Sequence, residues 1–225
     1  MSRHKWYRAK WSASMREMAK KIQQTAFMPE ATDGFVLDRA RDNEIEARFV
    51  EKIDVHQTVT DPFGGAVEFD RIEYRQWRFR LTTLSPGLEL LGSTKGSNAL
   101  AYRLAELSRN ELTLSNLNIN VLSWLARFQE IGGYHGFIDA MQVGNINLGQ
   151  SVKARAIVRG REDVKSYVAD FLAHNPHDIE KVQFKISGRD RRTISLSNSA
   201  GCVITGGGSE PIIDDLRKSL EHVAT

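Results

Sequence analysis

The residues best suited to chemistry form a glycine-rich run near the C-terminus, Gly206-Gly207-Gly208-Ser209. Backbone N–H groups of such a run can approach an anion closely, and a following helix would add the positive end of its dipole. The run lacks the Gly-Lys-Ser/Thr ending of a P-loop and the spacing of a dinucleotide-binding turn. Glu210 follows directly and would repel phosphate. We interpret the run first as a flexible connector. As an alternative, Gly206, Gly207, Gly208 and Ser209 bind phosphate in an enzyme or sensor for a phosphorylated small molecule or nucleotide.

Metal and nucleophilic chemistry have little support in the sequence. His174, His177 and Asp178 lie close together, but a zinc site needs three or more ligands, and a proline turn separates the two histidines. Cys202 is the single cysteine, and nothing next to it in sequence would activate its thiol. We predict no metal, no cofactor and no catalytic residue, and we favour a protein that is not an enzyme.

The N-terminal segment combines cations with aromatic rings, which is typical of nucleic-acid binding because bases stack on rings while lysines meet phosphates. Residues 1–21 contain seven basic side chains and one acidic side chain, so the rest of the chain, whose total is +3, carries a net charge of −3. An amphipathic helix is expected from Ser12 to Gln24, and we interpret its Trp/Met stripe first as packing on the core or on a second subunit. In the alternative, the segment binds nucleic acid or an anionic membrane surface. The predicted binding residues here are Arg3, Lys5, Trp6, Arg8, Lys10 and Trp11.

The C-terminal third shows the most regular pattern in the chain. Alternating residues predict strands over 152–158, 182–186 and 194–197, and apolar residues at helical spacing predict helices over 164–172 and 211–223. Helices on one side of the sheet would leave a basic face on the other side, which is either a docking surface or an ordinary solvated face. The predicted binding residues of this face and its turn are Lys153, Arg155, Arg159, Lys181, Lys185, Arg189, Arg191 and Arg192.

These elements predict an α+β fold in which antiparallel sheets pack on amphipathic helices and a βαββα unit ends the chain. A pseudo-twofold ββα repeat would relate 77–107 to 182–220. We expect a basic aromatic arm or helix at 1–28. A meander with two helices would follow at 29–133, and the C-terminal unit would occupy 134–225, with 29–225 as one domain in the alternative.

The composition is that of a globular protein, with 41% hydrophobic and 26% charged residues. No apolar run reaches the length of a transmembrane span, and a lone cysteine fits the reducing cytoplasm. We therefore predict a non-enzymatic binding or accessory subunit of a larger assembly, whose basic arm and sheet face engage DNA, RNA or an acidic protein. A homo-oligomer with a swapped N-terminal arm is the structural alternative.

Overall fold

Five helices and eleven strands make up the described chain, and the strand pairs within each unit run antiparallel. The computed structural model describes every residue except 150, 172, 174, 189–191, 207–209 and 224–225. Two units are present, and each is assembled from separated segments. The first unit contains Met1–Lys10, Leu84–Gly92 and Thr113–Thr225, and the second contains Trp11–Thr83 and Ser93–Leu112. The expected α+β class is confirmed, whereas the predicted pseudo-twofold repeat stays a prediction.

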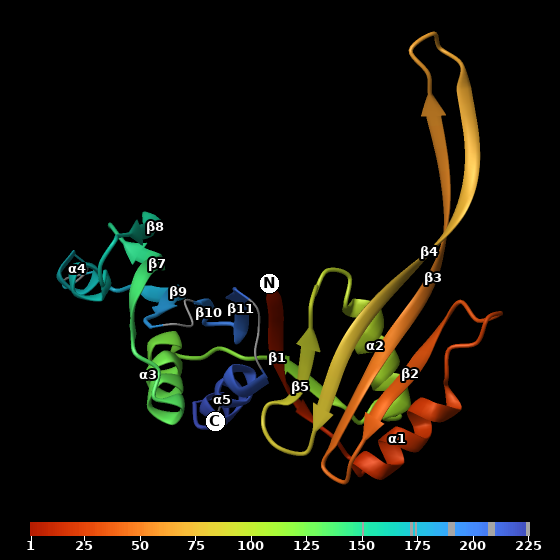
Figure 1. The fold of residues 1–225 in the computed structure, drawn as a ribbon, viewed down its shortest axis with the longest axis horizontal. Coiled ribbons are helices and arrows are strands. Elements are labelled where there is room, and N and C mark those ends of the chain that lie inside the picture. The colour runs from red at the N-terminus through yellow and green to blue at the C-terminus, as the bar shows by residue number, and fades with distance from the viewer. Residues whose placement is uncertain (150, 172, 174, 189–191, 207–209, 224–225) are drawn as a thin grey trace. The chain divides into compact units, whose positions relative to one another are not determined.

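The first unit is built on a sheet that joins the two ends of the chain (Figure 1). Its strand order is β5-β1-β11-β10-β9-β7-β8, with β6 also paired to β1. Its elements are β1 (Ser2–Lys10), β5 (Gly87–Leu91), β6 (Thr113–Asn116), α3 (Val121–Gly132), β7 (Gly136–Asn147), β8 (Lys153–Arg159), α4 (Lys165–Phe171), β9 (Asp178–Ile186), β10 (Thr193–Ser197), β11 (Gly201–Thr205) and α5 (Glu210–Glu221). Between α4 and α5 lie three strands, one more than the predicted βαββα unit.

The first ten residues do not form an arm. Ser2–Lys10 is an inner strand, paired with β5 on one edge and with β11 and β6 on the other. Trp6 is only 2% exposed and packs edge-on against Trp124 of α3. The prediction of a basic arm at 1–28 therefore holds only for its helix, because burial of the Trp6 ring fixes the preceding residues in the sheet.

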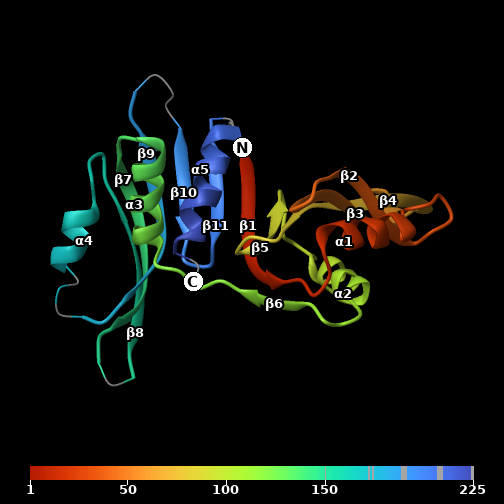
Figure 2. The same ribbon diagram turned by 90° about the horizontal axis from the view of Figure 1, so that it is seen from below.

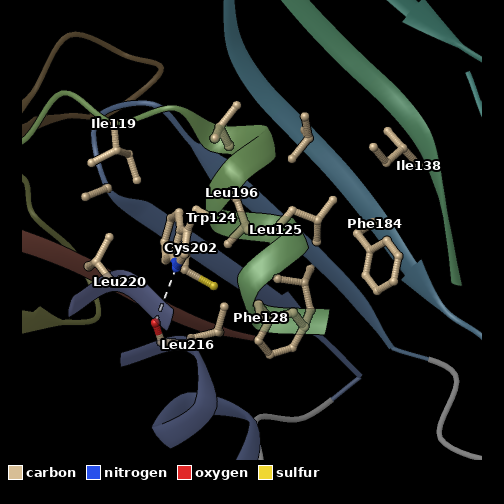
Figure 3. Packing of buried hydrophobic residues seen from close by; sticks show 14 of the residues in the cluster. Ile119, Trp124, Leu125, Phe128, Ile138, Phe184, Leu196, Cys202, Leu216 and Leu220 are labelled. Carbon is tan, nitrogen blue, oxygen red and sulfur yellow. Dashed lines mark hydrogen bonds between the residues drawn. The ribbon is translucent and has the colours of Figure 1, made fainter. Parts of the chain in front are cut away.

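The core of the first unit lies between one face of this sheet and the helices. Figure 2 shows α3 and α5 over the same face of β9 and β10, and α4 joins them through buried Val164 and Val168. Trp124 anchors the two long helices, because its indole Nε1 donates to Leu216 O (Figure 3). The same N–H also donates to Ser219 Oγ. The apolar strand positions predicted for β9 and β10 all enter this cluster.

The second unit packs two helices with a three-stranded meander. Its elements are α1 (Met15–Gln24), β2 (Asp33–Ala40), β3 (Glu44–Thr60), β4 (Ala66–Thr82) and α2 (Asn98–Leu107). Ser14 begins α1 with a capping box, in which its hydroxyl accepts from the Glu17 N–H while the Glu17 carboxylate accepts from the Ser14 N–H. Met15, Met18 and Ile22 are buried, which confirms the predicted apolar stripe and its packing on the core.

Strands β3 and β4 form a hairpin of 17 residues on each side, in continuous register from Glu44↔Thr82 to Thr60↔Ala66. Asp61 stabilises the turn, because its side chain accepts from the N–H groups of Phe63 and Gly65. The far half of the hairpin extends beyond β2 (Figure 1), and Phe63 at its tip is 96% exposed.

None of the helices in the described ranges has both the length and the apolar character that crossing a lipid bilayer requires.

Replacing Phe184 by alanine tests this core. The ring is buried between the sheet and the helices, so the substitution should lower the free energy of unfolding by about 3–5 kcal/mol. Urea denaturation followed by circular dichroism measures the change. Phe63→Ala at the exposed hairpin tip is the matched control and should change stability by less than about 0.5 kcal/mol. Equal effects of the two substitutions would contradict the packing described here.

Candidate nucleic-acid interface

The open face of the first unit's sheet is the side that α3, α4 and α5 leave uncovered. On β8, Ala154, Ala156 and Val158 pack against the core, so the alternate residues point to the other side. Those alternate residues include Lys153 and Arg155, and both are exposed. The edge strand of the sheet therefore presents its cations on the open face, as the sequence predicted.

Strands β9 and β10 continue this face toward the centre of the sheet. Phe184 and its apolar neighbours on β9 are buried, and Lys181, Gln183 and Lys185 alternate with them. The register places Lys185 opposite Thr193 and Gln183 opposite Ser195. Because residues directly opposite one another share a face, the lysines lie beside a row of hydroxyl and amide groups that can hydrogen-bond to a ligand.

Strand β1, which lies beyond β10 and β11, adds two further cations to the same face of the sheet. His4 and Trp6 are buried on the core side, and Arg3 and Lys5 alternate with them. Lys5 is half-buried, and this burial lowers the pKa of its ammonium group. Its Nζ donates to Ser199 O and lies 5.5 Å from the centroid of the Tyr7 ring. We call this set of seven side chains the cationic face: Arg3, Lys5, Lys153, Arg155, Arg159, Lys181 and Lys185.

Two carboxylates bind cations of this face. Glu180 accepts from Arg155 at 2.9 Å and from Gln142 at 2.6 Å. Asp139 lies 2.8 Å from Lys185 Nζ and accepts from Gln183 at 3.1 Å. Within the described part of the chain, no ion pair is formed by Lys153, Arg159 or Lys181. Arg155 and Lys185 are therefore paired, and the other five cations of this face form no ion pair within the described residues.

A hollow of about 630 Å³ lies where β9 ends and β10 begins. Its lining residues are Phe137, Lys185, Ile186, Ser187, Gly188, Arg192 and Thr193. Lys185 Nζ stands 5.9 Å from the centroid of the Phe137 ring. An aromatic ring beside two cations can stack on a base while the cations meet its phosphate. Phe137 was missed by the sequence analysis, because only the pairing of β7 with β9 brings it next to Lys185.

The remaining predicted binding residues are distributed as follows. Trp6 is not a candidate for the interface, because a buried indole cannot stack on a ligand. Arg8 and Lys10 are exposed in the last part of β1, and Trp11 belongs to the second unit. Arg189 and Arg191 lie outside the described residues, as do Gly207, Gly208 and Ser209 of the glycine run, whereas Gly206 adopts a left-handed φ of 95°.

Metal and thiol chemistry gain no support from the described residues. No group of three or more His, Cys, Asp and Glu side chains is placed there to hold a metal ion. His177 and Asp178 are exposed, and His174 lies outside the described part. Cys202 is buried, and this burial raises the pKa of its thiol, which therefore stays protonated at neutral pH.

A buried charged network ties α5 to the sheet. Glu89 of β5 is 3% exposed; its carboxylate lies 2.7 Å from His4 Nδ1 and accepts from Arg217 Nε at 2.8 Å. Arg217 also donates to Glu210 and Asp214. Burial alone would raise the pKa of Glu89, but the hydrogen bonds from His4 and Arg217 hold it below its ordinary value. Sequence reasoning missed this network, because His4 and Arg217 are 85 and 128 residues away from Glu89.

Comparison with known proteins gives no family assignment. No protein-family model matches the chain, and no curated protein matches it.

Glu89→Gln tests the buried network. At neutral pH the substitution should lower the free energy of unfolding by about 3 kcal/mol, because Arg217 loses its buried partner. The folded pKa of Glu89 lies below its unfolded value of about 4.5, so this stabilisation is complete above pH 4.5 and is lost as the pH falls through the folded pKa. Urea titrations between neutral and acidic pH should therefore show the wild type and the variant converging in acid.

The control for this prediction is Glu130→Gln, which removes an exposed partner of Arg127 on α3. It should change stability by less than about 1 kcal/mol. A constant difference between wild type and Glu89→Gln at every pH would contradict the role given to the charge of Glu89.

Proposed function

We propose that the protein is a non-enzymatic nucleic-acid-binding subunit and that the cationic face of its first unit is the binding surface. The observation that carries this proposal is the gathering of seven cations on one side of the sheet, five of which form no ion pair within the described residues. Positive charge gathered on one face attracts the phosphate backbone, and displacement of counterions then supplies much of the affinity. The overall net charge of +3 would give a much weaker argument, because it says nothing about where the cations lie.

A single-stranded ligand fits this surface better than a duplex. Recognition of unpaired strands combines a positive track for the backbone with aromatic rings on which bases stack. The hollow at Phe137 offers one such ring beside Lys185 and Arg192. Ser195 and Thr193, together with Gln183, supply hydrogen-bonding groups between the two rows of cations. We therefore infer binding of single-stranded RNA or DNA across the strands, with limited sequence preference.

Lys181→Glu is the direct test of this surface, because Lys181 is exposed on the open face and forms no ion pair within the described ranges. Fluorescence anisotropy with labelled single-stranded oligonucleotides, measured over a series of salt concentrations, should show weaker binding. The slope of log affinity against log salt should fall by about 1, because one phosphate contact is lost. Phe137→Ala should instead cost about 1–3 kcal/mol of binding energy with little change in this slope, since stacking is not ionic.

Lys165→Glu is the matched control. It makes the same charge change on α4, which lies on the covered side of the sheet, and a glutamate is well tolerated at a helix start. Its affinity should equal that of the wild type, and circular dichroism should show all three variants folded. The proposal is overturned if the wild type shows no salt-sensitive binding, or if Lys165→Glu weakens binding as much as Lys181→Glu.

A further inference from the structure

The far half of the β3–β4 hairpin, residues 53–73, is an unpartnered ribbon. We call it the arm; it is a different segment from the basic N-terminal arm that the sequence predicted at 1–28. Strand β2 pairs with β3 only as far as Glu51, so the outer edge of β3 from Ile53 to Thr60 has no strand partner in the described structure. The arm exposes large apolar side chains, including Phe63 and Val67, the latter 64% exposed. Free backbone edges and exposed apolar groups on a two-stranded ribbon are typical of an interaction surface.

The two sides of the arm differ in chemistry. The register places Val59 opposite Val67 and Gln57 opposite Phe69, so these residues share one side with Ile53 and Val55. The other side carries Asp54, with Glu68 opposite Thr58 and Asp70 opposite His56. In total the arm contains five carboxylates and one arginine. Arg71 and Glu73, which form an ion pair, lie opposite Val55 and Ile53, and Ile72 lies opposite Asp54. The arm is therefore an acidic ribbon that carries most of its apolar side chains on one side.

Strand β8 has the complementary character. It pairs only with β7, so its outer edge is also unpartnered within the described residues. Its core side carries Ala154, Ala156 and Val158, and its open side carries Ile157 and three cations, Lys153, Arg155 and Arg159. Helix α4 packs on β7 on the core side and exposes Tyr167 and Phe171, which add apolar surface there. The edge is seven residues long, against eight on the free edge of β3.

We propose that the arm of one copy of this chain adds to the β8 edge of a second copy. In that pairing the Ile53–Val59 side of the arm continues the apolar side of β8. Asp54, Glu68 and Asp70 fall on the side that holds Lys153, Arg155 and Arg159. The added strand satisfies backbone groups on both edges, and cross-strand pairs of opposite charge stabilise the register. Neither arm–arm nor β8–β8 pairing is favoured, because each brings like charges together.

Such a contact joins two different surfaces, so it is heterologous and repeats from copy to copy into a ring or an open chain. It requires no nucleic acid, although it shares Lys153, Arg155 and Arg159 with the surface proposed above. Sedimentation velocity of the nucleic-acid-free protein over a concentration series should therefore show masses rising above the 25.4 kDa of one chain.

Paired charge reversals test the contact. Asp54→Lys with Glu68→Lys alters the arm, and Lys153→Glu with Arg159→Glu alters β8. None of these four side chains forms an ion pair within the part of the chain that the structure describes. Each double variant alone should associate at least tenfold more weakly than the wild type. Mixing the two double variants should restore association, because each altered surface then meets an oppositely charged one.

Lys165→Glu with Lys218→Glu serves as the charge-matched control and should associate like the wild type. Folding of every variant is checked by circular dichroism. A wild type that stays at 25.4 kDa at every concentration overturns the proposal. A mixture of the two double variants that fails to associate also overturns it. So does a more compact monomer whose compactness does not depend on concentration, because the arm would then bind β8 of its own chain. Lys181→Glu should leave association unchanged, so a failure of nucleic-acid binding is recognised separately.

Discussion

Burial of one side of a twisted sheet beneath three helices is the constraint on which the rest of the first unit depends. Side chains alternate along a strand, so the demand that Val182 and Phe184 face α3 also decides where Lys181, Gln183 and Lys185 point. A slip of one residue would place the lysines under the helices, at a cost of several kcal/mol for each unpaired charge. The cationic face is thus a consequence of core packing, which fixes the side of the sheet from which its cations project.

The buried network around Glu89 stabilises the β5–β1 end of the same sheet. Strand β1 comes from the N-terminus, β5 from the middle of the chain and α5 from the C-terminus, and one carboxylate holds a residue from each end. Glu89 lies on the helix side, so its ion pairs with His4 and Arg217 do not consume charge from the cationic face. The two charged clusters are separated by the sheet itself, and each can be altered without changing the other.

Local patterns predicted much of this architecture. The alternation on β8, β9 and β10 and the apolar stripes of α1 and α5 were all evident, because each depends on residues close in sequence. The assignment of Trp6 to an exposed binding arm was wrong for a different reason. A tryptophan among lysines satisfies equally the pattern of a nucleic-acid-binding arm and that of an inner strand. Only the pairing of Trp6 with Glu89 and the hydrogen bond from its backbone N–H to Ala200 O, 83 and 194 positions further along the chain, decide between them.

The candidate site shows the same limit. The cations of β8 and β9 could be assigned to one face from alternation alone, but their partners could not. Glu180 neutralises Arg155 across β7, and Asp139 neutralises Lys185 at a bulge in the register between Ile138 and Ala140. A bulge changes which side chains share a face, and no residue type in that stretch indicates one. The hollow at Phe137 depends on the same pairing, so it too was beyond the reach of sequence reasoning.

The arm and a polyanion would draw on the same cations, and this links the two proposals physically. An arm seated on β8 would neutralise Lys153, Arg155 and Arg159, and a strand of nucleic acid would then meet chiefly Arg3, Lys5, Lys181 and Lys185. Affinity for the polyanion would fall, and by linkage the polyanion would weaken the arm contact by the same factor. Copies whose β8 edges are unoccupied, such as the terminal copy of an open chain, would then be the ones with the full cationic face. A closed ring would have no such copy, so the geometry of association would decide how strongly the assembled protein binds an anionic strand.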